Sequence, residues 1–382
     1  MRVYFDNAAT TSLCPQVLEA MLPYLREEYG NPSSTHTEGR RTRAAIERAR
    51  KTIANAIGAS IGEIFFTSGG TESNNMALKC AVRDLGVTRI ISSPIEHHCV
   101  LHSVETLGGQ GIQVDMVEID TYGRVNYEQL EQLLQHGDQK TIVSLMHANN
   151  EIGTLLDLGR VSQLCQEYGA YLHSDTVQTV GHFPIDVNKT PINFLSGAAH
   201  KFHGPKGIGF IYISNNNIVK PYIDGGAQER NMRGGTENLY GIIGLAKALE
   251  LAIDEMDERV AKIKSVRSYL KEKLQERVQG IRFNEDPDND SLYTVLSVSF
   301  PPSPKSELLL MSLDIAGISV SGGSACSSGS DVGSHVMQGI KAPLDYKAVR
   351  FSFCHNNTKE EVDYLMEKLT TILPAEHLAT VA

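Results

Sequence analysis

One lysine, Lys201, lies where the sequence could support covalent chemistry. An apolar run at residues 191–195 precedes it, and a run rich in β-branched and aromatic residues follows at 208–213. Both runs are typical of buried strands. A lysine that is desolvated between two strands has a lowered pKa, and its amine can form a Schiff base with a carbonyl. The alternative is a lysine that caps a turn.

Four groups of polar residues each follow a predicted strand. The strands cover residues 63–67, 89–92, 141–146 and 171–174, and the polar groups cover 67–75, 92–100, 147–153 and 173–178. Helical segments alternate with these strands and with a further strand at 113–117, which is typical of a mostly parallel sheet covered on both faces. The carboxyl ends of such strands share one edge, where ligands bind. We therefore expect the polar groups to meet Lys201 there.

The residue types in these groups suit one cofactor. The glycine-rich turn at 67–75 leads into a helix whose free N–H groups can bind a phosphate, although an ordinary capped turn has the same composition. Asp175 can pair with a protonated pyridine nitrogen, and His97 can stack on a planar ring or carry protons. A second glycine turn, at 233–238, is another candidate phosphate contact. Together with a Schiff-base lysine, these groups suit pyridoxal 5'-phosphate.

Residues 321–330 are almost all small and surround Cys326. Such a segment cannot pack a core, so it indicates a mobile loop that presents a reactive thiol; a surface loop with an incidental cysteine is the alternative. Arg350, 24 positions after Cys326, begins a predicted strand. It is a candidate for bidentate capture of a substrate carboxylate, although arginines at strand ends are often plain surface charges.

Composition excludes several classes of protein. The formal net charge of −10 argues against broad binding to nucleic acid or to an anionic membrane surface. No apolar run approaches the roughly 20 residues of a membrane span, and no signal peptide is evident, so we expect a cytoplasmic protein. The six cysteines are scattered without a CxxC pair, which indicates neither a zinc site nor a disulfide framework. We expect no metal.

The sequence pattern changes along the chain. Residues 239–274 have apolar residues at helical spacing, which predicts a long connecting helix that can contain one break. Strands at 297–300 and 350–353 and helices at 306–311 and 359–372 predict a second, α+β domain. We expect three parts, namely an N-terminal arm that joins the small domain (1–15), a large domain (16–260), and a small domain (261–382) that carries the mobile cysteine loop (about 321–338).

On these motifs the chain resembles the class V, fold-type I pyridoxal-phosphate enzymes, and among them the cysteine desulfurases of the NifS/IscS type. The resemblance covers essentially the whole chain and rests on residues 4–11, 31–36, 67–74, 96–98, 149–153, 175–178, 196–201, 233–236 and 323–326. It implies a large α/β domain with a mostly parallel, seven-stranded type of sheet, a smaller α+β C-terminal domain, and a homodimer.

The resemblance also implies how the cofactor is held. Lys201 carries it as a Schiff base, Asp175 pairs with the ring nitrogen, and His97 stacks on the ring and serves as acid and base. The other implied contacts are Gln178 and Asn150 to the ring oxygen or the substrate, and Gly70, Thr71, Ser196, His200 and, from the other subunit, Thr236 to the phosphate.

For the substrate, L-cysteine, the resemblance implies that Arg350, helped by Asn150, holds the carboxylate and that Cys326 attacks the sulfur. The products are alanine and a persulfide on Cys326, which passes to an acceptor protein in iron–sulfur cluster assembly or tRNA thiolation. The spacing from Cys326 to Arg350 favours the NifS/IscS group. Residues 353–357 and 331–346 depart from the family pattern, which affects the acceptor more than the chemistry.

Other functions fit the same fold. A selenocysteine lyase, a desulfhydrase that releases free sulfide, or a class V aminotransferase would use a similar cofactor site. An aminotransferase needs no thiol on a mobile loop, so Cys326 argues against it. A scaffold protein without turnover is the non-enzymatic alternative, and the sequence shows no lost catalytic group.

Overall fold

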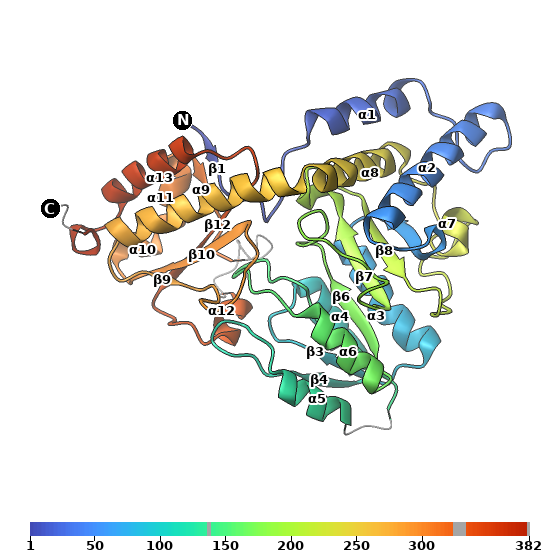
Figure 1. Cartoon of the computed structure of the whole chain (residues 1–382), viewed down its shortest axis with the longest axis horizontal. Coiled ribbons are helices and arrows are strands. Elements are labelled where there is room, and N and C mark those ends of the chain that lie inside the picture. The colour runs from blue at the N-terminus through green and yellow to red at the C-terminus, as the bar shows by residue number, and fades with distance from the viewer. Residues whose placement is uncertain (136–138, 324–333, 380–382) are drawn as a thin grey trace.

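A seven-stranded sheet forms the centre of the computed structural model (Figure 1). The structure describes residues 1–135, 139–323 and 334–379. The strands of this sheet, in spatial order, are β2 (Ile64–Thr67), β8 (Gly209–Ile213), β7 (Phe194–Ala198), β6 (Tyr171–Asp175), β5 (Thr141–Ser144), β3 (Arg89–Ser92) and β4 (Gln113–Met116). β8 runs antiparallel to both neighbours, and the other pairs are parallel. The expected mostly parallel sheet is confirmed.

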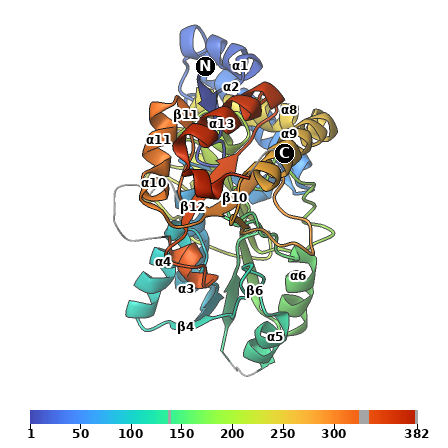
Figure 2. The same cartoon turned by 90° about the vertical axis from the view of Figure 1, so that its left-hand side faces the viewer.

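Helices cover both faces of this sheet, as Figure 2 shows for α4 on one side and α6 on the other. Successive strand residues point to opposite faces, so Ile142 and Phe194 join one apolar cluster while Val143 and Leu195 join another. The first cluster includes residues of α3 (Gly70–Leu85) and α4 (His98–Gly109). The second includes residues of α1 (Pro15–Arg26), α2 (Thr37–Ala56), α5 (Tyr127–Gln135), α6 (Leu158–Glu167) and α8 (Leu239–Asp254).

Short elements complete this part of the chain, namely η1 (Ile61–Glu63), η2 (Ala199–Lys201) and α7 (Gln228–Asn231). α7 is fixed to α2 by a buried ion pair. Arg50 donates from Nη1 and Nη2 to the two carboxylate oxygens of Glu229, at 2.7 and 2.9 Å. Glu229 also has a left-handed backbone, with φ of 45°, so this pair holds a conformation that few side chains favour.

The long connecting helix is present with one break. α8 ends at Asp254, and α9 (Met256–Arg277) starts after Glu255. α8 packs against the central sheet, whereas residues of α9 such as Leu270 and Leu274 belong to the apolar cluster of the second sheet. The two helices therefore link the two parts of the molecule, as Figure 1 shows in yellow and orange.

The second sheet is antiparallel and has the order β12 (Lys347–Ser352), β10 (Val295–Phe300), β9 (Arg282–Phe283). Around it lie α10 (Pro304–Glu307), α11 (Leu309–Ile315), α12 (His335–Gly339), α13 (Lys359–Ile372) and η4 (Ala375–His377). The helix expected at 306–311 is two short helices that meet at Leu308. Arg350 lies inside β12 and pairs with Ser297, not at the start of a strand as predicted.

The first residues of the chain cross from the second sheet to the first. β1 (Val3–Tyr4) pairs in parallel with β11 (Ile318–Ser319), and Val3 and Phe5 are buried in the cluster of the second sheet. Thr11 then bonds the backbone carbonyl of His200 beside the central sheet. In the described parts of the chain, no helix has the length and apolar character needed to cross a membrane.

Candidate active site

A cavity of about 250 Å³ lies at the carboxyl ends of the central strands. Its lining brings together nine of the predicted site residues, namely Gly70, Thr71, His97, Asn150, Asp175, Gln178, His200, Lys201 and Arg350. They come from segments that are far apart in the sequence. The parallel topology brings the segments of the central sheet to one edge, and Arg350 is added from β12 of the second sheet.

Lys201 enters the cavity from η2, the single turn that follows β7. Its Nζ donates hydrogen bonds to the backbone carbonyl oxygens of Ala8 and Ala9, at 2.6 and 2.9 Å. Gln178 bonds the same Ala8 carbonyl through Nε2, at 3.1 Å. The N-terminal segment is therefore part of the cavity wall.

Asp175 ends β6, and its carboxylate accepts three hydrogen bonds. Oδ2 accepts from Nδ2 of Asn74 at 2.7 Å, and Oδ1 accepts from the backbone N–H of Val177 at 3.0 Å. The hydroxyl of Ser196 lies 3.5 Å from Oδ1. These three donors hold the carboxylate in one orientation.

His97 caps the start of α4, and its Nδ1 accepts the backbone N–H of Cys99 at 3.2 Å. Burial lowers the pKa of His97, although the charge of Asp175 acts in the opposite direction. The ring is thus neutral near pH 7, and because Nδ1 is an acceptor, the ring proton is on Nε2.

The turn before α3 and the residue His200 offer the elements of a phosphate site. Gly70 and Thr71 form the first turn of a helix of 16 residues, where backbone N–H groups are free. A methyl group added at Gly70 would lie 2.6 Å from Cγ2 of Val177, so the backbone packs too closely for a side chain. His200 is neutral, because burial lowers its pKa to about 4, and its Nδ1 lies 3.2 Å from the hydroxyl of Thr10.

Arg350 is 2% exposed and is held from two sides. Its Nη1 donates to the backbone carbonyl of Asn150 and its Nη2 to Oδ1 of Asp6, both at 2.8 Å. Its Nε is buried without a hydrogen-bond partner among the described residues. Arg350 lines the cavity, and a guanidinium group with an unpaired N–H is suited to an anionic ligand.

Three predicted site residues do not line this cavity in the described structure. Ser196 lies in β7 with its hydroxyl toward Asp175, and Ala198 takes its expected place in the wall. Both side chains are on one face of β7, but Ser196 is two residues, roughly 6.6 Å, further from the strand end. Ser196 therefore does not line this cavity, and its role as a phosphate ligand stays a prediction. Thr236 is exposed, away from the cavity lining of its own chain, and Cys326 lies outside the described residues.

Sequence reasoning missed several residues of the wall, namely Ala8, Ala9, Asn74, Cys99 and Met146. Asn74 could have been found, because it follows Thr71 by three positions and Gly70 by four, which places it on the same side of α3. The carbonyl groups of Ala8 and Ala9 carry no such signal.

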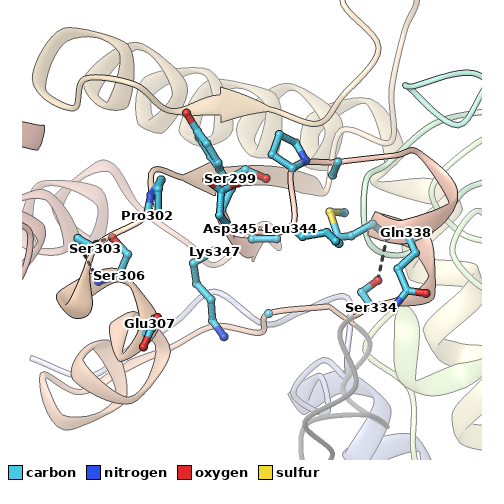
Figure 3. Close-up of a pocket in the computed structure, with 16 residues that line it drawn as sticks. Ser299, Pro302, Ser303, Ser306, Glu307, Ser334, Gln338, Leu344, Asp345 and Lys347 are labelled. Atoms are coloured by element: carbon cyan, nitrogen blue, oxygen red, sulfur yellow. Dashed lines mark hydrogen bonds between the residues drawn. The ribbon is translucent and has the colours of Figure 1, made fainter.

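A larger cavity, of about 400 Å³, lies beside the second sheet (Figure 3). Ser299, Ser303 and Lys347 line it, and Ser303 and Ser306 share a hydrogen bond of 2.8 Å. None of the predicted cofactor or substrate residues lines it, so cavity volume alone would not have identified the cavity that holds them. In the described residues, no group of three or more His, Cys, Asp or Glu side chains could hold a metal ion.

Comparison with known proteins places this geometry in context. Residues 3–365 match the model of the family described as Aminotransferase class-V. "Cysteine desulfurase IscS" of Dictyoglomus turgidum is 44% identical over 97% of this chain and 96% of its own length, and "Cysteine desulfurase IscS" of Methanosarcina thermophila is 43% identical over 97% and 92%. A solved "NIFS-LIKE PROTEIN" superposes with a TM-score of 0.90 at 38% identity, covering 97% of this chain and 99% of that one. "SspA in complex with cysteine" gives 0.81 at 30% identity, over 94% and 100%.

Proposed function

This chain belongs to the class-V aminotransferase family and is a cysteine desulfurase, and we propose that it works with pyridoxal 5'-phosphate on Lys201 and a persulfide on Cys326. The observation that carries the proposal is the meeting of Lys201, Asp175, His97 and Arg350 in one cavity of about 250 Å³. Lys201 supplies the amine, Asp175 the partner of the cofactor ring, His97 a proton carrier and Arg350 the group that binds the substrate carboxylate.

The described residues fit the cofactor. The unpaired, buried Nε of Arg350 and the side-chain-free backbone at Gly70 indicate an anionic ligand. In our proposal Lys201 binds the aldehyde carbon, Asp175 pairs with the ring nitrogen, and His97 packs on the ring. The N-terminal turn of α3 and His200 hold the phosphate. When bound, the cofactor supplies an electron-withdrawing ring that stabilises negative charge on the substrate carbons.

The protein's own groups then orient L-cysteine and move its protons. Arg350 binds the substrate carboxylate through the N–H groups that Asp6 and Asn150 leave free. Lys201 Nζ takes the proton from the α-carbon, since a lysine amine can serve as a base once it is not covalently engaged. His97 holds a proton on Nε2 inside the cavity, where it can be donated and taken back.

Sulfur leaves by attack of the Cys326 thiolate on the substrate sulfur. The new S–S bond forms as the bond between the substrate sulfur and its β-carbon breaks, so cysteine and the enzyme thiol become alanine and an enzyme persulfide. The outer sulfur then passes to a thiol of an acceptor protein, for which iron–sulfur cluster assembly and tRNA thiolation are the two candidates. We place this reaction in the cytoplasm, in agreement with the free state of the five described cysteines.

We also propose that the active enzyme is a homodimer in which Thr236 contacts the phosphate of the partner's site. Thr236 is exposed in the single chain, and exposed apolar side chains on neighbouring helices, Leu18, Leu25 and Tyr240, are available for an interface. Mixed dimers of Lys201→Ala and Thr236→Ala chains test this, because one site then carries both changes and the other carries neither. Recovery of activity on mixing supports the shared site, and no recovery contradicts it.

The central test combines absorbance and product analysis. Wild-type protein loaded with pyridoxal phosphate should show the visible band of a protonated Schiff base and form alanine from L-cysteine in the presence of a reducing thiol. Lys201→Ala should lose both. Cys326→Ala should keep the band and lose alanine formation, whereas an aminotransferase would keep its activity in that variant. A wild-type protein that shows no visible band with excess cofactor would refute the proposal.

A further inference from the structure

We infer that His173 is a positioning residue for the cofactor site and that it acts on Asp175 through the side-chain amide of Asn74. Asn74 donates from Nδ2 to Oδ2 of Asp175 at 2.7 Å, and its Oδ1 lies 3.1 Å from Nε2 of His173. On the other side of the ring, Nδ1 of His173 lies 2.8 Å from the hydroxyl of Ser144. The inference rests on the proposed role of Asp175.

Hydrogen-bond chemistry allows one assignment of protons along this chain of contacts. A carboxylate accepts hydrogen bonds, so the amide nitrogen of Asn74 faces Asp175 and its oxygen faces His173. That oxygen needs a donor, so Nε2 of His173 carries the ring proton. Nδ1 is then bare and accepts from the hydroxyl of Ser144, so this one tautomer of His173 satisfies both the amide oxygen of Asn74 and the hydroxyl of Ser144.

The residues that make these contacts are almost completely buried. Asn74 and Ser144 are 0% exposed, His173 is 1% and Asp175 is 6%. Hydrogen bonds are electrostatically stronger in such surroundings, and an unsatisfied group is correspondingly costly. Burial also lowers the pKa of His173 to about 4, so the ring stays neutral and keeps its tautomer across the physiological range.

The consequence concerns the carboxylate that faces the cofactor ring. If His173 did not donate to the amide oxygen, that buried oxygen would lose this donor, and the amide would no longer be held where Nδ2 donates to Asp175 at 2.7 Å. Asp175 would then lose one of its two short hydrogen bonds and keep the one from the backbone of Val177. A carboxylate with fewer donors carries a less dispersed negative charge, which favours a proton on the adjacent cofactor.

The first measurement needs neither cofactor nor turnover. In apoenzyme labelled with ¹⁵N-histidine, assigned by comparison with His173→Gln, the His173 signals should show a protonated Nε2 and a bare Nδ1 that do not change between pH 6 and 8. A protonated Nδ1, or a ring that titrates in this range, would overturn the inference. Because this result is independent of cofactor binding, it stands apart from a failure of the proposed function.

The second measurement follows the pH midpoint of the visible absorbance of the loaded enzyme. His173→Phe keeps ring volume but removes the donor to Asn74, so the midpoint should rise by about 0.4 to 1 pH unit, the equivalent of one neutral hydrogen bond. His173→Gln is the matched control, because its amide nitrogen can replace Nε2, and it should retain the wild-type midpoint. If His173→Phe fails to fold, Ser144→Ala tests the same chain of contacts with a smaller shift. An unchanged midpoint in the folded Phe or Ala variant would refute the role.

Discussion

Substitution of Arg350 by lysine would separate substrate recognition from cofactor binding. Arg350 lines the cavity and is fixed by Asp6 and by the carbonyl of Asn150, and its buried Nε has no hydrogen-bond partner among the described residues. Lysine keeps the positive charge and can still reach Asp6, but it lacks the planar set of N–H donors. The change therefore removes hydrogen bonds to the substrate carboxylate while most of the long-range attraction remains.

The size of the effect follows from the chemistry of this contact. A hydrogen bond to a charged group contributes roughly 1.5–3 kcal/mol, and removing it from a buried site weakens binding about 10- to 150-fold. The loss should apply to every ligand with a carboxylate at this position. It should not apply to a ligand that lacks the carboxylate.

L-Alanine and ethylamine form a matched pair for this test, because they differ only by the carboxylate. Each would be measured as a competitive inhibitor of the initial rate of sulfide release from L-cysteine in the presence of a reducing thiol, in wild type and in Arg350→Lys. We expect alanine to weaken 10- to 150-fold and ethylamine to change less than about twofold. The visible absorbance and thermal midpoint of both proteins would be recorded as controls for cofactor loading and folding.

Two results would refute this account of Arg350. Equal weakening of alanine and ethylamine would mean that the substitution disturbs the cavity in general. Unchanged affinity for alanine would mean that the substrate carboxylate binds elsewhere.

Three further predictions concern buried charged and titratable groups. Burial lowers the pKa values of three histidines, His147, His173 and His182, to about 4, so below about pH 6.5 the folded state binds fewer protons than the unfolded state. The free energy of unfolding, measured in urea, should therefore fall as the pH is lowered from 6.5 toward 4, and the fully buried His173 should account for about 3 kcal/mol of this loss. Burial raises the pKa of Glu96, so the protein loses stability as the pH rises from 4.5 toward the pKa of Glu96 in the folded state. Glu96→Gln should therefore be more stable than wild type at pH 7 and equally stable at pH 4, and a gain in stability that is independent of pH would contradict this. Arg50→Met should cost about 3–5 kcal/mol by leaving the Glu229 carboxylate buried and unpaired, and Arg50→Met/Glu229→Gln should recover much of it in the same urea assay.

Much of the cavity was predictable because parallel topology leaves little choice. His97 and Asn150 each follow a strand and Asp175 ends one, and the carboxyl ends of β3, β5 and β6 meet at one edge whatever the exact strand lengths are. Lys201 was identified by the apolar runs on both sides of it, which are β7 and β8. These inferences depend on strand order and direction, which hydrophobic patterning determines well.

The remaining features depend on position to within two residues or on contacts between distant segments. Ser196 and Ala198 share a face of β7, and patterning does not say which one reaches the strand end. The strand that holds Arg350 begins three residues earlier than predicted, so this residue is buried within the sheet. The carbonyls of Ala8 and Ala9 bond Lys201 across more than 190 positions, and backbone groups leave no trace in residue type.

The first residues of the chain cross from one sheet to the other, and some of their contacts can form only after distant residues have been translated. Asn7 bonds Ser352, which is 345 positions later in the chain. At about 5–20 residues per second, translation separates the two by roughly 17 to 70 seconds. During that interval the leading segment lacks its contact with β12, so a chaperone that shields nascent Phe5 should raise the yield of active enzyme, and a slow codon placed after Ser352 should not.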